Sequence, residues 1–270
     1  MPKFMENLDA YAAFFIAGVK NSVSYKKNVM FSLLFKIAFA VIMVLVWTAI
    51  YFNTNSATIG GLTLKQVYAY FFVYSAIWLI INLGISVIVQ NDVQSGGIAA
   101  QLTRPTNYIL QVFFYSLGDQ PIWILFVSIP LIFIVNFFVP ITLTAVSALA
   151  FLAEILLGLV AASLIDFFIA TLVFYLDHIW GVISASQYAI NILSGGILPL
   201  VFFAPQINGV LMLLPFQMFG YTETATLLGI ISIPAIITEL LVTLAWVLIL
   251  SVLGVFWWKR VVRKIKGAGG

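Results

Sequence analysis

The sequence predicts an all-α, polytopic membrane protein with six transmembrane helices, an N-terminal amphipathic interfacial helix, and short re-entrant or interfacial helices before the last span. Of its 270 residues, 63% are hydrophobic and only 8% are charged, whereas a soluble domain carries about 25% charged residues. Several uninterrupted apolar runs reach the roughly 20 residues that cross a bilayer. Basic residues gather beside these runs. A β-barrel would instead show alternating segments of about ten residues.

The N-terminal region is expected to form an amphipathic helix on the membrane, within a cytoplasmic segment of residues 1–28. Phe4, Leu8, Tyr11 and Phe15 recur at spacings of three and four, and charged residues occupy other positions. This spacing places the apolar side chains on one face of a helix.

The six predicted spans cover residues 31–52, 67–89, 108–135, 143–175, 179–203 and 230–258. A polar loop at residues 91–107 joins the second and third spans. Prolines interrupt residues 204–228, and each removes a backbone donor, so we expect an external re-entrant region there. A basic cytoplasmic tail at residues 259–270 follows the last span. The whole chain, residues 1–270, is expected to form a single transmembrane domain.

The positions of the basic residues predict the orientation. Of the 12 lysines and arginines, Lys65 alone falls on the opposite side of the predicted bundle from the others. By the positive-inside rule, both termini and the 91–107 loop are cytoplasmic, which requires an even number of crossings. The predicted location is the cell inner or plasma membrane, as a multi-pass protein. Because the basic residues lie beside apolar spans, they indicate membrane lipid as a partner and no nucleic acid.

The residue inventory excludes several chemistries. The chain has no cysteine and one histidine, His178, so disulfides and a His/Cys metal cluster are excluded. No phosphate-binding P-loop sequence is present. We therefore expect no catalytic residue, no metal site, no cofactor bound by this chain, and no ATPase activity of its own. The Asp177-His178 pair is interpreted as a tight cytoplasmic turn, and it is also the one place that approaches the polar cluster that a lipid-modifying enzyme needs.

Four acidic residues lie inside predicted spans, where an ionised side chain is costly and a functional role is the default hypothesis. They are Asp119, Glu154, Asp166 and Glu239. Two interpretations stay open. The side chains face the bundle interior and form structural hydrogen bonds, or they carry protons during transport.

Two stretches resemble a known family, the type 2 ATP-binding-cassette (ABC) export permeases. The first is the loop from Gly97 through Leu102-Thr103-Arg104-Pro105. The second combines Ser194-Gly195-Gly196-Ile197-Leu198-Pro199-Leu200, Phe202-Phe203-Ala204-Pro205 and Leu213-Leu214-Pro215-Phe216. Together with the N-terminal helix and six spans, the resemblance covers nearly the whole chain.

The resemblance implies a transmembrane permease subunit that exports a hydrophobic or amphipathic substrate. A separate cytosolic ABC ATPase subunit would bind ATP and Mg and hydrolyse the ATP. The permease would dimerise with itself or with a paralogous permease. The residues implied in coupling to the ATPase are Asp92, Gln94, Gly96, Gly97, Gln101, Arg104 and Pro105. Those implied in the translocation pathway or gate are Gly195, Gly196, Pro199, Phe203, Pro215 and Phe216.

The alternative function is a proton-coupled secondary transporter that uses the intramembrane acidic residues. Such transporters normally have more spans or an internal repeat, and no convincing repeat occurs here. Lipids, drugs, hydrophobic peptides and glycolipids fit an apolar pathway equally well.

Overall fold

The computed structural model describes residues 2–24, 26–54, 56–176 and 178–268. Helices dominate this part of the chain, and its strands are limited to a two-residue hairpin, β1 (Thr58–Ile59) and β2 (Leu62–Thr63). Gly60 and Gly61, both with positive φ, form its turn. The all-α polytopic class is therefore confirmed.

Five helical segments are long and apolar enough to cross a membrane. They are formed by α2 (Lys26–Thr54), α3 (Leu64–Ile81), α6 (Tyr108–Trp123) with α7 (Ile129–Phe138), α8 (Ala145–Ala170) with the 3-10 turn η2 (Thr171–Phe174), and α12 (Ile233–Ala268). The predicted fifth span, residues 179–203, contains only the 14-residue helix α9 (Trp180–Leu193). At a rise of about 1.5 Å per residue, such a helix is too short for the bilayer core. The count of six spans is not confirmed.

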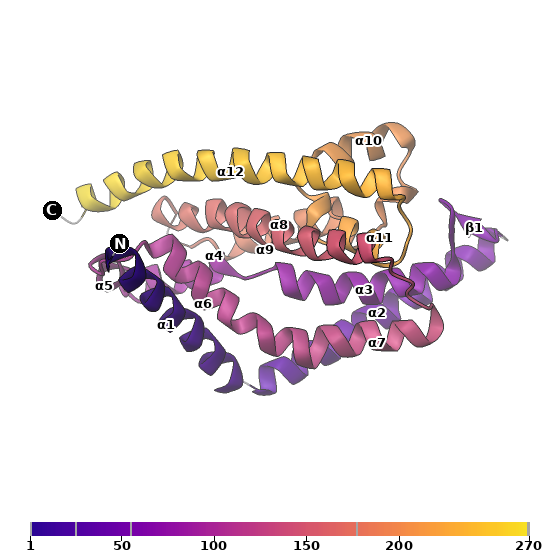
Figure 1. Cartoon of the computed structure of the whole chain (residues 1–270), viewed down its shortest axis with the longest axis horizontal. Helices are drawn as coiled ribbons and strands as arrows, with labels where there is room; N and C mark the ends of the chain where they lie inside the picture. Colours follow the sequence, from indigo (N-terminus) through magenta and orange to yellow (C-terminus); the bar gives the residue numbers. More distant parts are fainter. Residues whose placement is uncertain (1, 25, 55, 177, 269–270) are drawn as a thin grey trace.

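The N-terminal and C-terminal segments are both helical. Helix α1 (Pro2–Ser24) covers most of the predicted interfacial segment, and Met1 and Tyr25 lie outside the described residues. At the other end, α12 continues without a break through the predicted basic tail as far as Ala268. The start of α1 and the end of α12 lie at the same end of the bundle as α5 (Ile98–Leu102), while β1 lies at the opposite end (Figure 1).

The predicted second span is wrong as a single helix. Its apolar run is interrupted at residues 82–84, which separate α3 from α4 (Ile85–Gln94). Asn82 has extended backbone geometry and Gly84 has a φ of 64°, a conformation that glycine adopts without steric cost. The chain therefore leaves the α3 axis before it reaches the 91–107 loop.

The third predicted span, residues 108–135, is one continuous helical segment with an irregular centre. Pro121 lies inside α6, and a π-helical segment, η1 (Ile124–Ser128), joins α6 to α7. Proline removes a backbone donor and displaces the preceding turn, and π segments absorb such irregularities. Within η1, the Ser128 hydroxyl donates to the carbonyl oxygen of Ala76 on α3 at 2.9 Å.

The region before α12 is built from short helices, as predicted. It contains η3 (Leu200–Phe202), α10 (Pro205–Leu213), η4 (Gln217–Phe219) and α11 (Tyr221–Leu227). Every residue of α11 is buried, and α11 packs against α3 and α8. This short polar helix is therefore part of the interior of the bundle.

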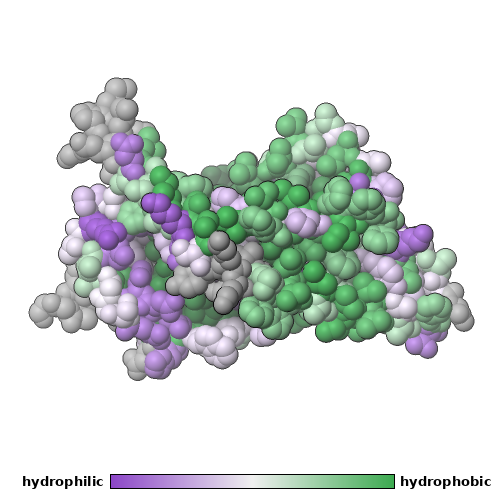
Figure 2. All heavy atoms as spheres, turned by 90° about the horizontal axis from the view of Figure 1, so that it is seen from below, coloured by the Kyte–Doolittle hydropathy of each residue, from purple (hydrophilic) through white to green (hydrophobic). Residues whose placement is uncertain are grey.

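The molecular surface matches a membrane environment. On the face shown in Figure 2, apolar residues form a broad band across the middle, and hydrophilic residues gather toward the two ends. Large apolar side chains on the candidate spanning helices are exposed on the surface, and Phe137, for example, is 74% exposed. Such a band is suited to the hydrocarbon core of a bilayer, where no water is present to solvate a polar surface.

Candidate functional site

Helix α4 begins at a carboxylate supplied by another helix. No side chain of its own caps its N-terminus, where Gly84 adopts the left-handed conformation. Asp166 of α8 fills this role, because its Oδ2 accepts the backbone N–H of Ser86 at 3.0 Å. A carboxylate there satisfies a free backbone donor and complements the helix dipole. Asp166 thus fixes the start of α4 to the centre of the bundle.

The end of α4 turns sharply into α5. Gly96 has a φ of 74°, and its N–H donates to the Val93 carbonyl at 3.1 Å. Gly97 then precedes α5 as its N-cap residue. All the predicted coupling residues fall on this α4–α5 segment, residues 85–105, and Gln94, Gly96, Arg104 and Pro105 are exposed. They offer a surface at the end of the bundle.

Two side-chain hydrogen bonds connect the α4–α5 segment to other elements. The Tyr108 hydroxyl, at the start of α6, donates to Oδ2 of Asp92 at 2.7 Å. Gln94 Nε2 lies 3.1 Å from Nδ1 of His178, in the turn before α9. His178 therefore contacts the α4–α5 segment. Asp177, the other member of the pair considered in the sequence analysis, lies outside the described residues.

Helix α1 crosses α6 at two glycines. A Cβ atom on Gly18 would lie 2.0 Å from the carbonyl oxygen of Tyr115, and one on Gly118 would lie 2.0 Å from that of Phe15. The two backbones are therefore in direct contact. The Tyr11 and Phe114 rings stack beside the crossing, with centroids 5.3 Å apart.

Further contacts join α1 to the α4–α5 segment and its neighbours. The Arg104 guanidinium lies over the Phe14 ring, 5.5 Å from its centroid, a cation–π arrangement. The Tyr11 hydroxyl accepts the backbone N–H of Asn107 at 3.0 Å. The structure therefore places α1, the predicted interfacial helix, in contact with the loop whose residues the resemblance implies in coupling.

The predicted gate residues occupy a separate region around α3. Gly195 and Gly196 lie within the predicted fifth span, residues 179–203, but they follow the end of α9 and are not helical. Instead, they form a turn against two tyrosines. The Tyr70 hydroxyl donates to the Gly195 carbonyl at 2.9 Å, and the hydroxyl groups of Tyr74 and Ser194 are 2.6 Å apart.

This turn lies against α3 because its glycines have no side chain. A Cβ atom on Gly195 would lie 2.6 Å from the Tyr70 hydroxyl oxygen, and one on Gly196 would lie 2.6 Å from the Tyr74 ring. The other predicted gate residues lie along the same irregular stretch: Pro199, Phe203, Pro215 and Phe216. Pro199 and Pro215 are buried, and Phe203 and Phe216 are partly buried and pack on the main core.

Asp166 and Asp119, two of the four predicted intramembrane acids, each accept a hydrogen bond at Oδ2. Asp166 caps α4, and Asp119 accepts the indole N–H of Trp123 at its Oδ2, with a distance of 2.7 Å. Both bonds fit the structural interpretation of these residues. Asp119 also lies at the α1–α6 crossing, where the Ser22 hydroxyl donates to its backbone carbonyl at 3.4 Å.

The other two acids belong to a buried group that the sequence analysis only partly identified. Glu154 Oε1 accepts the Thr226 hydroxyl at 2.9 Å, while Oε2 of Glu154 and Oε2 of Glu239 are buried without hydrogen-bond partners. Glu223 on α11 is fully buried, and neither of its carboxylate oxygens has a hydrogen-bond partner. Burial raises the pKa of Glu223 well above its ordinary value, and the charge of Glu154 raises it further.

The sequence analysis missed Glu223 because residues 204–228 were expected to be external. The signal available was its i, i+3 spacing to Thr226 on one short helix, but this does not reveal burial. Figure 1 shows that the α4–α5 segment and the α10 region lie toward opposite ends of the bundle. The predicted coupling and gate residues therefore form two separate groups.

Comparison with known proteins identifies the family. The model of a family described as ABC-2 family transporter protein matches residues 27–269. The sequence matches no curated protein. The family match covers most of the chain. It includes all five candidate spans and leaves out the N-terminal helix α1. The chain therefore belongs to the ABC-2 family of membrane transporter proteins.

Proposed function

We propose that this chain is the transmembrane permease subunit of an ABC exporter and that a separate cytosolic subunit binds and hydrolyses the ATP. The observation that carries the proposal is the family match across residues 27–269. No P-loop occurs in the sequence, so ATP and Mg would be held by the partner subunit. The substrate is hydrophobic or amphipathic, in keeping with the apolar surface and interior of the bundle.

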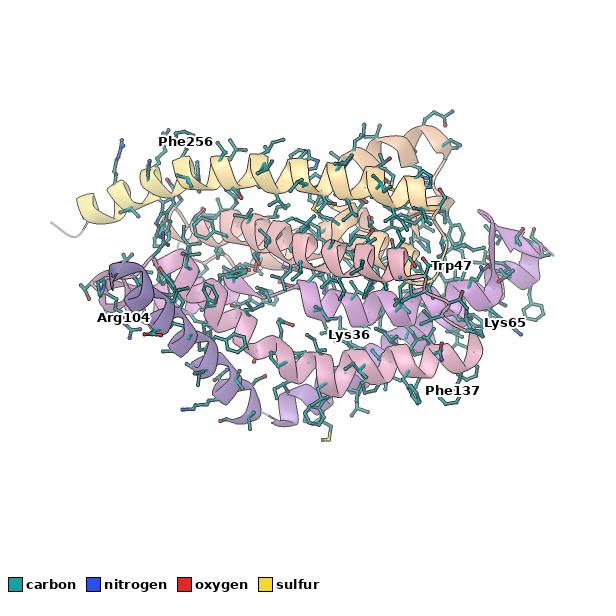
Figure 3. All side chains as sticks on the ribbon, in the orientation of Figure 1. Lys36, Trp47, Lys65, Arg104, Phe137 and Phe256 are labelled. Carbon is teal, nitrogen blue, oxygen red and sulfur yellow. The ribbon has the colours of Figure 1, made fainter. Side chains whose placement is uncertain are left out.

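The proposed orientation places the α5 end in the cytoplasm. Arg104 lies at this end, whereas Lys65 lies at the opposite end, near the hairpin (Figure 3). The C-terminal basic residues extend along α12 toward the end that also carries the N-terminus (Figure 1). By the positive-inside rule, the Arg104 end, both termini and residues 91–107 face the cytoplasm. The α10 region, residues 204–228, then lies toward the outer face.

The α4–α5 segment is the proposed docking and coupling element. Its start is held by Asp166 on α8, Tyr108 on α6 donates to Asp92 near its middle, and Gln94 contacts His178 before α9. These hydrogen bonds join it to three elements of the bundle. A displacement of the segment by the ATPase would therefore be transmitted to these elements together, as in other transitions between packed arrangements. Helix α1 would move with it through the Arg104–Phe14 contact.

The gate is proposed at the turn formed by Gly195 and Gly196, together with Pro199, Phe203, Pro215 and Phe216. This turn is held against α3 by Tyr70 and Tyr74. A change in the position of α3 would therefore shift the turn. The permease would work as a dimer, with itself or with a paralogous permease, and the substrate would pass along the interface between the two subunits.

The test is purification of the tagged protein in mild detergent, followed by identification of the retained ATPase and measurement of its activity. Arg104→Glu reverses the charge on the proposed docking surface. We expect it to lower both ATPase retention and coupled ATPase activity by roughly ten-fold, the effect of placing like charges in an interface. Lys65→Glu is the matched control, because it makes the same charge change at the opposite end of the bundle.

Equal melting temperatures of the two variants would show that the loss in Arg104→Glu is not a loss of folding. If the chain is recovered without any ATPase under several conditions, or if Lys65→Glu has the same effect, the proposal fails. Substrate flux that follows an imposed proton gradient without ATP would instead favour the proton-coupled alternative.

A further inference from the structure

Helix α12 is longer than a membrane span requires. It runs from Ile233 to Ala268, 36 residues in all, and at about 1.5 Å per residue it is roughly 54 Å long. The hydrocarbon core of a bilayer is only about 30 Å thick. In Figure 1 the C-terminal end of α12 extends past the end of α8. Because this end also carries the basic residues, it is the end that enters the headgroup region.

Contacts with neighbouring elements fix the rotation of this end of α12 about its own axis. Trp258 stacks on the Tyr108 ring of α6, with centroids 6.0 Å apart, and lies edge-on to Phe167 of α8 at 5.4 Å. The Trp257 indole N–H donates to the Thr171 hydroxyl at 2.7 Å. Both indoles therefore pack against the bundle, and the opposite face of α12 points away from it.

The buried residues of α12 define the same inward side. Leu250 and Val261 are buried, and a Cβ atom on Gly254 would lie 3.8 Å from Leu164 of α8. These positions are four and seven residues apart, so they lie on one side of the helix. The outward face is thus defined by two independent sets of contacts.

The outward face changes from apolar to basic along one line. Val252 is 56% exposed and Phe256 is 67% exposed, and Phe256 lies on the side of α12 that faces away from the other helices (Figure 3). Lys259, Arg260 and Arg263 are also exposed. They follow Phe256 at spacings of three, four and seven residues, which continue the same face. An exposed apolar stripe therefore ends directly at a group of three cations.

No acidic residue of the same helix balances this group. Glu239 is the last acidic residue in the sequence, and two further lysines, Lys264 and Lys266, follow the three cations. Like charges three and four residues apart on a helix repel each other. An anion shared between them removes this repulsion. Clusters of roughly four to eight basic residues beside a spanning helix are typical of anionic-lipid recognition.

Two simpler explanations do not account for the arrangement. A helix dipole favours cations only within about the last turn, and Lys259 and Arg260 lie more than two turns before the end of α12 at Ala268. The positive-inside rule explains the side of the membrane on which cations lie. It does not explain why these three lie on the one face that continues the apolar stripe.

We propose that the outward face of α12 binds an anionic phospholipid. The lipid phosphate lies between Lys259, Arg260 and Arg263, and an acyl chain lies along Phe256. Arginine offers N–H donors in a fork that matches the oxygens of a phosphate. The stripe and the cations follow one another in the order in which a phospholipid presents its chains and headgroup to a spanning helix. A nucleic acid or an acidic protein has no alkyl chain for the stripe.

The inference goes beyond the proposed function, because lipid binding does not require an ATPase. The experiment titrates the purified chain in a nonionic detergent with dioctanoylphosphatidylglycerol and resolves the successive binding steps by native mass spectrometry. Dioctanoylphosphatidylcholine is the matched probe, since it has the same chains and phosphate but no net charge. We expect the first phosphatidylglycerol to bind at least about ten-fold more tightly than the first phosphatidylcholine and than the second phosphatidylglycerol.

The first pair of variants separates this face from the overall charge of the protein. Arg260→Gln/Arg263→Gln should weaken the first binding step by roughly 30-fold, because each basic residue near an anionic surface contributes about 1 kcal/mol. Lys20→Gln/Lys65→Gln is the matched control: it lowers the net charge equally at exposed positions on α1 and α3. It should leave the first step unchanged, because distant exposed charges are screened.

Photo-cross-linking tests where the acyl chain lies. The photoreactive residue p-benzoylphenylalanine replaces Phe256 in one variant and Phe137, an exposed phenylalanine on α7, in the control. In an equal mixture of the two lipids, we expect phosphatidylglycerol to be enriched among the products at position 256 by roughly ten-fold over position 137. Adding Arg260→Gln/Arg263→Gln should abolish this enrichment. All substituted positions are on the surface, so folding is not at risk from overpacking.

Several results would overturn the proposal. They are equal binding of the two lipids, an equal loss in Lys20→Gln/Lys65→Gln, and equal enrichment at positions 256 and 137. Glycerol phosphate and a short oligothymidylate serve as competitors at the same phosphate concentration as the lipid, and neither should displace it. Displacement by the first would assign the face to a free anion, displacement by the second would assign it to nucleic acid, and either would overturn the proposal.

Discussion

The α1–α6 crossing makes a quantitative prediction for Gly118→Ala. The added Cβ atom would lie 2.0 Å from the carbonyl oxygen of Phe15, 2.9 Å from its carbonyl carbon and 3.1 Å from its Cα. Ordinary contact begins at 3.4 Å, so α1 must move away by about 1.4 Å. All three atoms belong to the backbone, and no side-chain rotation can relieve the overlap.

The energetic cost follows from two losses and one gain. Overpacking of this kind costs about 1–3 kcal/mol. Separation of the helices also weakens the Tyr11–Phe114 stack, which is worth about 0.5–1.5 kcal/mol. Alanine regains about 1 kcal/mol of helix propensity over glycine. The net effect is a loss of about 0.5–3.5 kcal/mol in the attachment of α1.

Hydrogen exchange measured by mass spectrometry reports this attachment directly. A loss of about 0.5–3.5 kcal/mol corresponds to exchange in α1 that is roughly 2- to 400-fold faster, because local opening follows the local free energy. Exchange in the middle of α12 should stay unchanged. Gly209→Ala is the matched control: this helical glycine has nothing within 4 Å of a built Cβ atom, so exchange in α1 should match the wild type.

A double variant sharpens the test. Gly18→Ala produces the same overlap from the other side, against the Tyr115 carbonyl oxygen. Once one alanine has separated the helices, the second should cost little, so the two effects should be strongly non-additive. Exchange in Gly118→Ala within about two-fold of the wild type, or fully additive effects of the two alanines, would refute the inference of direct backbone contact.

Three other predictions concern buried polar groups. Asp166→Ala should destabilise the protein by about 1–3 kcal/mol, because it leaves the Ser86 N–H without its acceptor. Asp166→Asn should retain part of this hydrogen bond through its amide oxygen. Thermal unfolding in detergent measures the stability of both variants. Tyr74→Phe should cost about 1 kcal/mol by removing the hydrogen bond to Ser194, measured in the same way. Burial raises the pKa of Glu223 above 4.5, so its carboxyl group keeps a proton in the folded state after the unfolded chain has lost it. The free energy of unfolding should therefore fall as pH rises above about 4.5, by up to about 1.4 kcal/mol per pH unit. Glu223→Gln should flatten this dependence, and an unchanged pH profile would contradict the assignment.

Hydropathy predicted the class of the protein and the position of most spans. The apolar run at 31–52 lies within a helix of the structure, and the runs at 143–175 and 230–258 are helical over most of their length, because lipid requires a continuous helix wherever a long apolar run crosses it. The run at 67–89 was misread because its apolar character continues across a break in the backbone. Asn82 and Gly84 provided a turn signal that an average over the whole run does not register.

The α1–α6 crossing could not be predicted, for a different reason. Gly18 and Gly118 are 100 positions apart, and each alone is consistent with a simple small residue in a helix. Only the pairing of the two backbones gives the glycines their role. Likewise, Asp166 was a candidate for function because it lies in an apolar span, and its bond to the N-terminus of α4 becomes visible only when α8 and α4 are placed together.

Helix α11 shows most clearly how a polar segment can belong to the interior. Its threonines and Glu223 resemble an external stretch when polarity alone is considered, yet every residue of the helix is buried. Thr226 donates to Glu154 of α8, and Thr222 hydrogen-bonds to Gln217 before the helix, so part of its polarity is satisfied within the bundle. Glu223 has no such partner for either oxygen, and an ionised carboxylate without one is costly in such surroundings. The neutral form therefore suits this position, which is why the pH profile of Glu223→Gln tests the placement of α11 itself.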